Sequence, residues 1–246
     1  MASLDLLTAA GFRKDGRMLD QHRRVKAEMG SFGANGGATY QCGKTMVMAQ
    51  VMEDEQVPCA SPQLVVSLSW APFAFPERRL QRQNRLSSTY EKALKDTFEP
   101  VLQNKTNPAA AINVQLTVLC ADGGTLAACV NATTLALTRS GYALDDLVIA
   151  STVALADEYL FVDPTHYELI KKDCDLTVAC LSRTKEVALM SSECKTKVDN
   201  LALMLETATE SSIRDVLPVV VAAQEAHAQR VSILRTLVSE RLIASV

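Results

Sequence analysis

Two consecutive stretches, Ile112-Asn113-Val114-Gln115-Leu116-Thr117-Val118-Leu119 and Asp122-Gly123-Gly124-Thr125-Leu126, decide the fold of this chain. The first alternates in polarity, which predicts a β-strand with one buried face. The alanine-rich, glycine-free residues 127–138 predict a helix. A double glycine between a strand and a helix leaves free backbone N–H groups at the positive end of the helix dipole, where anions bind. Leu126 occupies a position where a phosphate site would normally place a cation.

Further strands and helices are expected on both sides of this unit. Strand patterns occupy residues 23–32, 38–52, 63–70, 147–154, 159–162, 176–181 and 187–190. Residues 88–102 have helical spacing, with Ser87 or Ser88 as N-cap and Glu91 as the capping-box partner. From Lys195 onward a long C-terminal helix is expected, bent or divided near Pro218. This order predicts a two-layer α/β fold, of the α+β kind.

Composition limits the class of protein. The 246 residues carry a net charge of −3, which gives no general attraction to nucleic acid. The longest apolar run, 216–223, is far shorter than the ~20 residues that cross a bilayer, so no membrane role is expected.

Seven cysteines without a C-x-x-C pair predict free thiols in a reducing compartment. His22, His166 and His227 are far apart in sequence, so we expect no metal and no cofactor.

Motifs along nearly the whole chain resemble ribonuclease PH-like proteins in a consistent order. They are Gly11–Arg17, Arg23-Arg24, Met29-Gly30, Gly36–Ala38, Gly43–Thr45, Asp122–Ala132, Gly141–Leu147 and the strand that starts at Asp175. Within that family the chain resembles ring subunits of the eukaryotic RNA exosome. The resemblance implies one β-α-β domain over residues 1–246, with a mixed sheet. Its core would span about 12–194, with a C-terminal helical segment at about 195–246.

The resemblance also implies a site. Active members degrade RNA from the 3′ end by phosphorolysis, which requires cations around phosphate and a carboxyl group near the leaving oxygen. Leu86, Leu126 and Leu169 match positions that carry charged catalytic residues in active relatives, and Asp175 matches a retained aspartate. The implied protein is therefore not an enzyme. It would be a structural and RNA-channel subunit that supports 3′-to-5′ RNA processing and degradation, including rRNA maturation and mRNA turnover, by a separate nuclease.

Two alternatives remain open. The chain is an active phosphate-dependent 3′-to-5′ exoribonuclease if a partner supplies the missing groups, or if Asp173 and Lys171-Lys172 replace them. A small-molecule kinase of similar architecture is more remote, because Gly43-Lys44-Thr45 lacks the glycine spacing of a phosphate loop and better fits a turn between strands.

Other polar residues nearby have simpler interpretations. Asp163 and Glu168 could form an acid–base pair, but solvent-facing loop acids are the preferred interpretation. His166 is expected at the surface.

A basic loop supplies the candidate RNA contact. Residues 77–85 contain four arginines and one glutamate, a local charge of +3; the arginines are Arg78, Arg79, Arg82 and Arg85. Composition alone favours a solvated surface loop. The resemblance places the loop at the central channel of a ring, against single-stranded RNA. It also implies a ribonuclease PH-like partner in a hexameric ring, RNA-binding cap subunits, a hydrolytic nuclease, and a location in the nucleus, nucleolus and cytoplasm.

Overall fold

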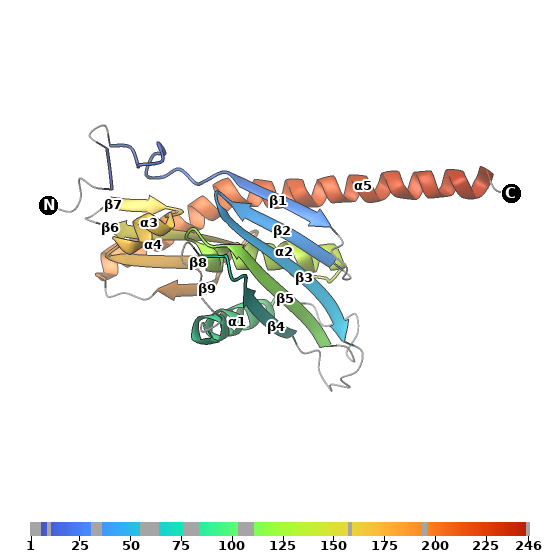
Figure 1. Ribbon diagram of the computed structural model, residues 1–246, viewed down its shortest axis with the longest axis horizontal. Coiled ribbons are helices and arrows are strands. Elements are labelled where there is room, and N and C mark those ends of the chain that lie inside the picture. The colour runs from blue at the N-terminus through green and yellow to red at the C-terminus, as the bar shows by residue number, and fades with distance from the viewer. Residues whose placement is uncertain are drawn as a thin grey trace.

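The computed structural model describes residues 6–8, 11–30, 36–54, 64–75, 84–102, 111–156, 159–192 and 196–244. Within these ranges the strands form two sheets (Figure 1). The five-stranded sheet has the order β1-β2-β3-β5-β4, from strands Val25–Gly30, Gly36–Cys42, Thr45–Asp54, Ala111–Cys120 and Leu64–Trp70. The four-stranded sheet has the order β7-β6-β8-β9, from strands Tyr159–Val162, Val148–Ala156, Cys174–Leu181 and Val187–Ser192.

The first sheet is mixed, as the resemblance implied. Strand β4 runs parallel to β5, whereas the other strand pairs in the sheet are antiparallel. The parallel pair requires a crossover connection, and helix α1 (Asn84–Phe98) lies within it and packs on β4. The second sheet is antiparallel throughout. The α/β prediction is therefore confirmed.

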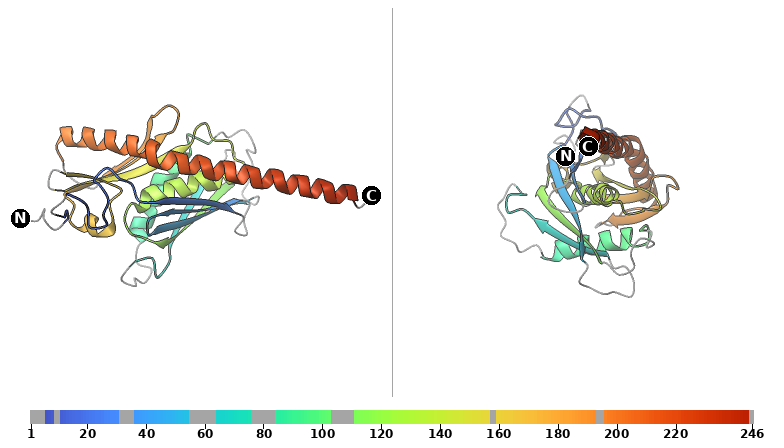
Figure 2. Two further views of the ribbon diagram at one scale, coloured as in Figure 1. Left: turned by 90° about the horizontal axis from the view of Figure 1, so that it is seen from above. Right: turned by 90° about the vertical axis from the view of Figure 1, so that its right-hand side faces the viewer.

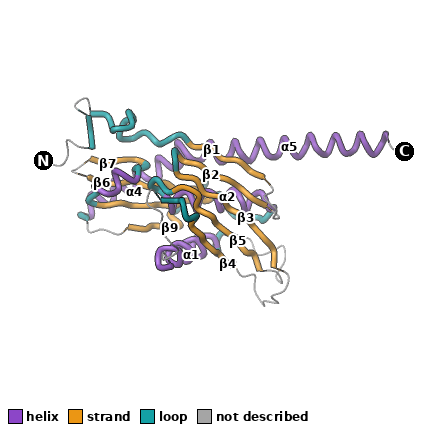
Figure 3. The backbone as a smooth tube through the Cα atoms, in the orientation of Figure 1, coloured by secondary structure: helices purple, strands orange, loops and turns teal. Residues whose placement is uncertain are grey.

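Helix α2 (Thr125–Ser140) packs against both sheets and lies among their strands (Figure 3). It contacts β2 and β3 of the first sheet and β6 of the second. Every residue from Leu126 to Leu137 is buried, which explains why the sequence there is rich in small and apolar residues without a polar stripe. The largest core cluster joins residues of both sheets through this helix. We retain one domain over residues 1–246 as a proposal on that ground.

Two local predictions near the first sheet are corrected. The expected strand 38–52 is divided into β2 and β3 at Gly43-Lys44, where Gly43 has a φ of +58°, which confirms the turn between strands that Gly43-Lys44-Thr45 favoured. Helix α1 begins at Asn84, so the capping box on Ser88 does not form. Glu91 instead accepts a hydrogen bond from the backbone N–H of Leu68 at 2.8 Å, because the helix packs beside β4 and the edge strand has a free donor there.

The C-terminal helical segment is divided as expected, by a stretch of π-helix. Helix α4 (Val198–Ser211) continues through π-helical residues Ser212–Val216 into α5 (Leu217–Ala244). Pro218 has no N–H and its ring conflicts with a carbonyl one turn earlier, so a wider turn before it relieves the conflict. Helix α5 passes β1 and extends beyond both sheets (Figure 2).

The cysteines agree only in part with the expectation from the sequence. Cys42, Cys120, Cys129 and Cys180 are free thiols, but Cys174 is disulfide-bonded, which contradicts the expectation of free thiols alone. Cysteine spacing could not show this, because a disulfide depends on which residues the fold brings together.

Among the helices in the described ranges, none has the length and apolar character needed to cross a membrane.

Candidate functional site

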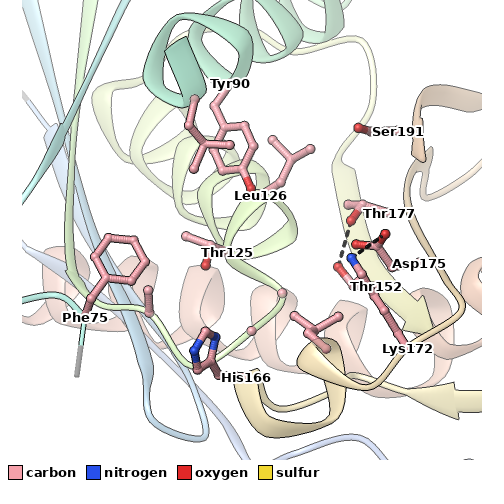
Figure 4. Close-up of a pocket in the computed structure, with 15 residues that line it drawn as sticks. Phe75, Tyr90, Thr125, Leu126, Thr152, His166, Lys172, Asp175, Thr177 and Ser191 are labelled. Carbon is pink, nitrogen blue, oxygen red and sulfur yellow. Dashed lines mark hydrogen bonds and ion pairs between the residues drawn. The ribbon is translucent and has the colours of Figure 1, made fainter. Parts of the chain in front are cut away.

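A cavity of about 200 Å³ lies where the two sheets meet at the start of α2 (Figure 4). The first half of the chain contributes Phe75, Leu86, Tyr90, Ala121, Gly123, Gly124, Thr125 and Leu126. The second half contributes Thr152, His166, Leu169, Lys172, Asp175, Thr177 and Ser191. The structure thus brings Leu86, Leu126, Leu169 and Asp175 together in one place, although they are up to 89 positions apart in sequence.

The double glycine shapes the end of α2 that borders this cavity. Gly123 and Gly124 have φ values of +89° and +61°, which favour glycine. A Cβ atom on Gly123 would lie 2.3 Å from the carbonyl oxygen of Pro164, so this position also requires glycine for space. Within the part of the chain that the structure describes, no side chain caps the helix. Its first N–H groups, which have no partner within the helix, are therefore available to an anion.

An ion pair lies across the cavity from this turn. Lys172 Nζ is 2.6 Å from Asp175 Oδ1, and the two side chains are 27% and 22% exposed. Among the described residues that line the cavity, Lys172 is the only lysine or arginine and Asp175 the only carboxylate. Lys171 does not line it, and its Nζ instead lies 5.2 Å from the centroid of the Tyr167 ring. The short helix α3 (His166–Ile170), which was not predicted, places Lys172 at the cavity.

Much of the remaining lining is apolar. Leu86, Leu126 and Leu169 line the cavity with Phe75 and Tyr90, and Leu126 is only 5% exposed. The aromatic side chains are held by Trp70, whose ring centroid lies 5.0 Å from that of Phe75 and 6.1 Å from that of Tyr90. The cavity thus combines an apolar lining with one ion pair.

Asp163 is buried behind the cavity, contrary to the expectation of a solvent-facing acid. It is 3% exposed and receives bonds from Arg23 Nε and Nη2, both at 2.7 Å. Burial raises the pKa of Asp163, but the hydrogen bonds from Arg23 and the nearby His22 outweigh it, so the pKa lies well below its usual range. The carboxylate therefore remains charged and structural.

Glu168 is also buried, at 6% exposed, so the second acid was predicted wrongly as well. Arg13 is fully buried and holds it by two bonds, Nε to Oε1 at 2.8 Å and Nη2 to Oε2 at 2.7 Å. Glu168 also completes a capping box with Thr165 at the start of α3. His166, expected at the surface, is half-buried and lines the cavity. Arg13 of the N-terminal segment covers Glu168, whereas the backbone N–H of His166 donates to Asp122 Oδ1 at 3.3 Å, beside the glycine turn.

His22, Cys42 and Asp163 lie close enough together to hold a metal ion, with all three ligand atoms within 4.8 Å of one another. The same oxygen of Asp163 that would bind a metal is 2.7 Å from Arg23 Nε, and His22 Nδ1 lies 3.0 Å from the backbone oxygen of Arg23. A guanidinium in contact with the ligand oxygen repels a metal cation. These contacts favour a hydrogen-bonded network rather than a metal centre.

Of the arginines in the candidate RNA-binding loop, the structure describes Arg85. Arg78, Arg79 and Arg82 lie outside the described residues. Arg85 is exposed in the first turn of α1, one residue before Leu86 at the cavity.

The chain is similar in sequence to exosome complex components and in fold to two solved structures. Exosome complex component RRP41 of Bos taurus is 32% identical over 243 residues, covering 95% of this chain and 99% of that protein. Exosome complex component Rrp41 of Archaeoglobus fulgidus is 28% identical over 218 residues, covering 85% of this chain and 84% of that protein. Rice Rrp46 matches the fold with a TM-score of 0.72 at 20% identity, over 88% of this chain and 100% of the rice chain. A chain of the Archaeoglobus fulgidus exosome with RNA bound to the active site also matches with a TM-score of 0.72 at 18% identity. The match covers 82% of this chain and 91% of the archaeal chain.

Family models match both halves of the chain. The first domain of a 3′ exoribonuclease family, RNase PH, matches residues 21–143, and the second matches residues 146–211. These matches and the RRP41 relatives contradict the prediction that the chain is not an enzyme. That prediction counted the leucines at 86, 126 and 169 and gave too little weight to Lys172, which the fold brings into the same cavity. The chain belongs to the RNase PH family of 3′ exoribonucleases.

Proposed function

We propose that this chain is a ring subunit of an RNA exosome, and that its cavity shortens RNA from the 3′ end with inorganic phosphate as the attacking group. The observation that carries the proposal is the open N-terminus of α2 facing the Lys172–Asp175 ion pair across one cavity. The relatives named as exosome complex components, which align over most of their length, support the ring.

Two elements would hold the phosphate. The first is the N-terminus of α2, whose dipole contributes about 0.3–1 kcal/mol at an exposed site. The second is the ammonium group of Lys172, which the ion pair with Asp175 fixes at the cavity. Charged hydrogen bonds are about twice as strong as neutral ones, so Lys172 is the stronger of the two. The leucines offer no donor to the phosphate, and binding therefore depends on these two elements.

The reaction then needs one displacement. A phosphate oxygen attacks the phosphorus of the last phosphodiester, and the bond from phosphorus to the 3′ oxygen of the preceding nucleotide breaks. The products are a nucleoside diphosphate and an RNA shorter by one nucleotide, whose 3′ oxygen takes up a proton. That proton comes from the attacking hydrogen phosphate, and we assign its relay to the Asp175 carboxylate, the acid among the described lining residues, which accepts the proton and passes it to the leaving 3′ oxygen.

Delivery of RNA is assigned to the basic loop. Arg85 is exposed beside the cavity wall, and Arg78, Arg79 and Arg82 precede it in sequence, so a single strand held by the loop would end near Leu86. Arginine suits this role because its planar fork binds phosphate and stacks on bases. The further partners we propose are a second ribonuclease PH-like subunit, RNA-binding cap subunits and a hydrolytic nuclease, in the nucleus, nucleolus and cytoplasm.

The test is a phosphate-dependent RNA assay. The purified chain, alone and reconstituted with ring partners, is incubated with 3′-labelled single-stranded RNA with and without inorganic phosphate. We expect nucleoside diphosphate only with phosphate, and a loss of roughly a hundredfold in Lys172→Met. Lys171→Met is the matched control, since Lys171 lies against Tyr167 outside the cavity, and it should retain activity. Absence of phosphate-dependent release from the wild-type ring would refute the proposal.

A further inference from the structure

Arg23 joins the two halves of the molecule directly behind the cavity, although it does not line it. On one side Arg23 Nη1 donates to the carbonyl oxygen of Asp122 at 2.7 Å, and Nη2 donates to that of Gly123 at 3.2 Å. On the other side Nε and Nη2 each lie 2.7 Å from an oxygen of Asp163. Arg23 is 8% exposed, so these contacts are shielded from solvent. One guanidinium thus connects the glycine turn to the loop that leads into α3.

The two connected segments also touch each other. The backbone N–H of His166 donates to Asp122 Oδ1 at 3.3 Å, and the missing Cβ of Gly123 leaves room for the Pro164 carbonyl oxygen. A shift of either segment would change the distance between the first turn of α2 and the wall that carries Lys172. The spacing of the two anion-binding elements therefore depends on the groups that hold this contact.

We infer that Arg23 is a positioning residue for phosphate binding, and that it acts by holding the Asp122–Gly124 turn at a fixed distance from the Lys172 wall. The inference rests on the proposed function for its effect on phosphate. The hold of Arg23 on the turn can be measured independently of activity, by hydrogen exchange of the backbone amides in the turn. The planar fork is essential, because a lysine could pair with Asp163 but has no rigid set of donors for both carbonyl oxygens as well.

Arg13 provides a matched control. It is fully buried and makes an equivalent two-bond pair with Glu168, and it donates to the Val162 carbonyl oxygen at 2.6 Å. It has longer contacts to the carbonyl oxygens of Asp163, at 3.4 Å, and Gln21, at 3.5 Å, and none of these partners belongs to the glycine turn. Arg13→Lys therefore imposes the same chemical change on a buried ion pair without removing a contact to the glycine turn. A role of Arg23 that was only structural would make the two lysine variants behave alike.

Hydrogen exchange on the full chain measures the geometric part. The amides of Ala121 and Ala128 flank the turn and are hydrogen-bonded, to the oxygens of Ala74 and Gly124 respectively. We expect Arg23→Lys to accelerate exchange in residues 121–128 by roughly tenfold, since it loses charged hydrogen bonds to the turn. Arg13→Lys should leave that segment unchanged and accelerate residues 162–171. Equal acceleration of residues 121–128 in both variants, or none in either, would overturn the inference.

Kinetics in the reconstituted ring measures the effect on phosphate. Arg23→Lys should raise the KM for inorganic phosphate by roughly tenfold with kcat within about threefold of wild type, since an interaction present in both ground and transition state is weakened. A fall in kcat alone with KM unchanged would overturn the inference. If the wild type shows no phosphate-dependent activity while the exchange pattern holds, the proposed function fails and the hold of Arg23 on the turn stands.

A second variant covers failure of Arg23→Lys to fold, which circular dichroism would reveal. Thr45 is fully buried, and its hydroxyl donates to the Gly123 carbonyl oxygen at 2.8 Å and accepts from the Asp122 N–H at 3.1 Å. Thr45→Val removes these two bonds to the same turn and leaves the Arg23–Asp163 pair in place. Thr45→Val should accelerate hydrogen exchange in residues 121–128 and raise the KM for phosphate, each by a smaller factor than Arg23→Lys does. An unchanged KM with faster exchange in Thr45→Val would refute the link between turn position and phosphate.

Discussion

Replacing Asp163 by asparagine measures how much the buried network behind the cavity stabilises the fold. The carboxylate accepts hydrogen bonds from the backbone N–H of Arg23 at 3.1 Å and from its guanidinium at 2.7 Å, and from the Cys42 thiol at 3.1 Å. Asparagine has nearly the same size but no charge, and its NH₂ group cannot accept a bond. The variant therefore removes the buried counter-charge of the Arg23 guanidinium and leaves only Asp122, whose Oδ2 lies 3.6 Å from Arg23 Nη1 and whose side chain is 26% exposed.

The expected cost is large. Breaking a buried ion pair by removing one partner destabilises a protein by about 3–5 kcal/mol, against a total stability of about 5–15 kcal/mol. Asp175→Asn is the control, because Asp175 is 22% exposed and its pair with Lys172 is partly solvated. Partly exposed pairs contribute about 0–1 kcal/mol. The difference between the two variants should therefore be at least about 2 kcal/mol.

The pH dependence follows from the lowered pKa of Asp163. A carboxyl group whose folded pKa is depressed stabilises the fold above its unfolded pKa of about 3.9, and this contribution is lost as pH falls toward the folded pKa. Between pH 7 and pH 3 the gap between wild type and Asp163→Asn should narrow by about 1 kcal/mol.

Urea unfolding followed by circular dichroism at both pH values measures these free energies. The reasoning is refuted if the unfolding free energy of Asp163→Asn at pH 7 lies within about 1 kcal/mol of that of Asp175→Asn, because the loss of the buried partner of Arg23 would then cost no more than the loss of a partly exposed one.

Two further predictions concern glycine and cysteine. Gly123→Ala should destabilise the chain by about 2–4 kcal/mol, because it combines a positive φ with a Cβ 2.3 Å from the Pro164 carbonyl oxygen. Gly11→Ala has a similar φ but nothing within 4 Å, so it should cost only about 1 kcal/mol in the same urea titration. Burial raises the pKa of the Cys42 thiol well above its ordinary value, so Cys42 should react with a thiol reagent at pH 8 far more slowly than the half-exposed Cys120. Peptide mass spectrometry of the native and urea-unfolded chain measures this, and equal native rates would contradict it.

Local sequence patterns were sufficient for most of the elements. The strand before the double glycine and the helix after it were predicted within two residues of β5 and α2, and strand 159–162 agrees with β7. The alternation of polar and apolar residues and the glycines at turns reflect local backbone preferences, and the fold keeps these preferences. The capping box at Ser88 failed for the opposite reason. Its pattern is genuine, but Glu91 finds a stronger partner on β4, which only the packing of the helix provides.

The buried acids show the same limit more clearly. Asp163 and Glu168 lie in a polar stretch that predicts exposure, yet both are covered by arginines of the N-terminal segment, 140 and 155 positions earlier. Charged residues are seldom buried unless they are paired, and the pairing is a property of the fold. A sequence signal did exist, because the motif Gly11–Arg17 and the Arg23-Arg24 pair belong to the resemblance, but it did not identify their partners.

The leucines of the cavity raise a different question, which concerns how charge is counted at a site. Matching Leu86, Leu126 and Leu169 to charged positions of relatives asks whether each charge stands at the same place in the sequence. A phosphate responds instead to the field at one point in space, which any group within a few ångströms can supply. Lys172 and the first turn of α2 both border the cavity, so the loss of cations at two aligned positions does not leave it without positive potential. The location of charge in the folded cavity, rather than at aligned positions, is therefore what the Lys172→Met assay tests.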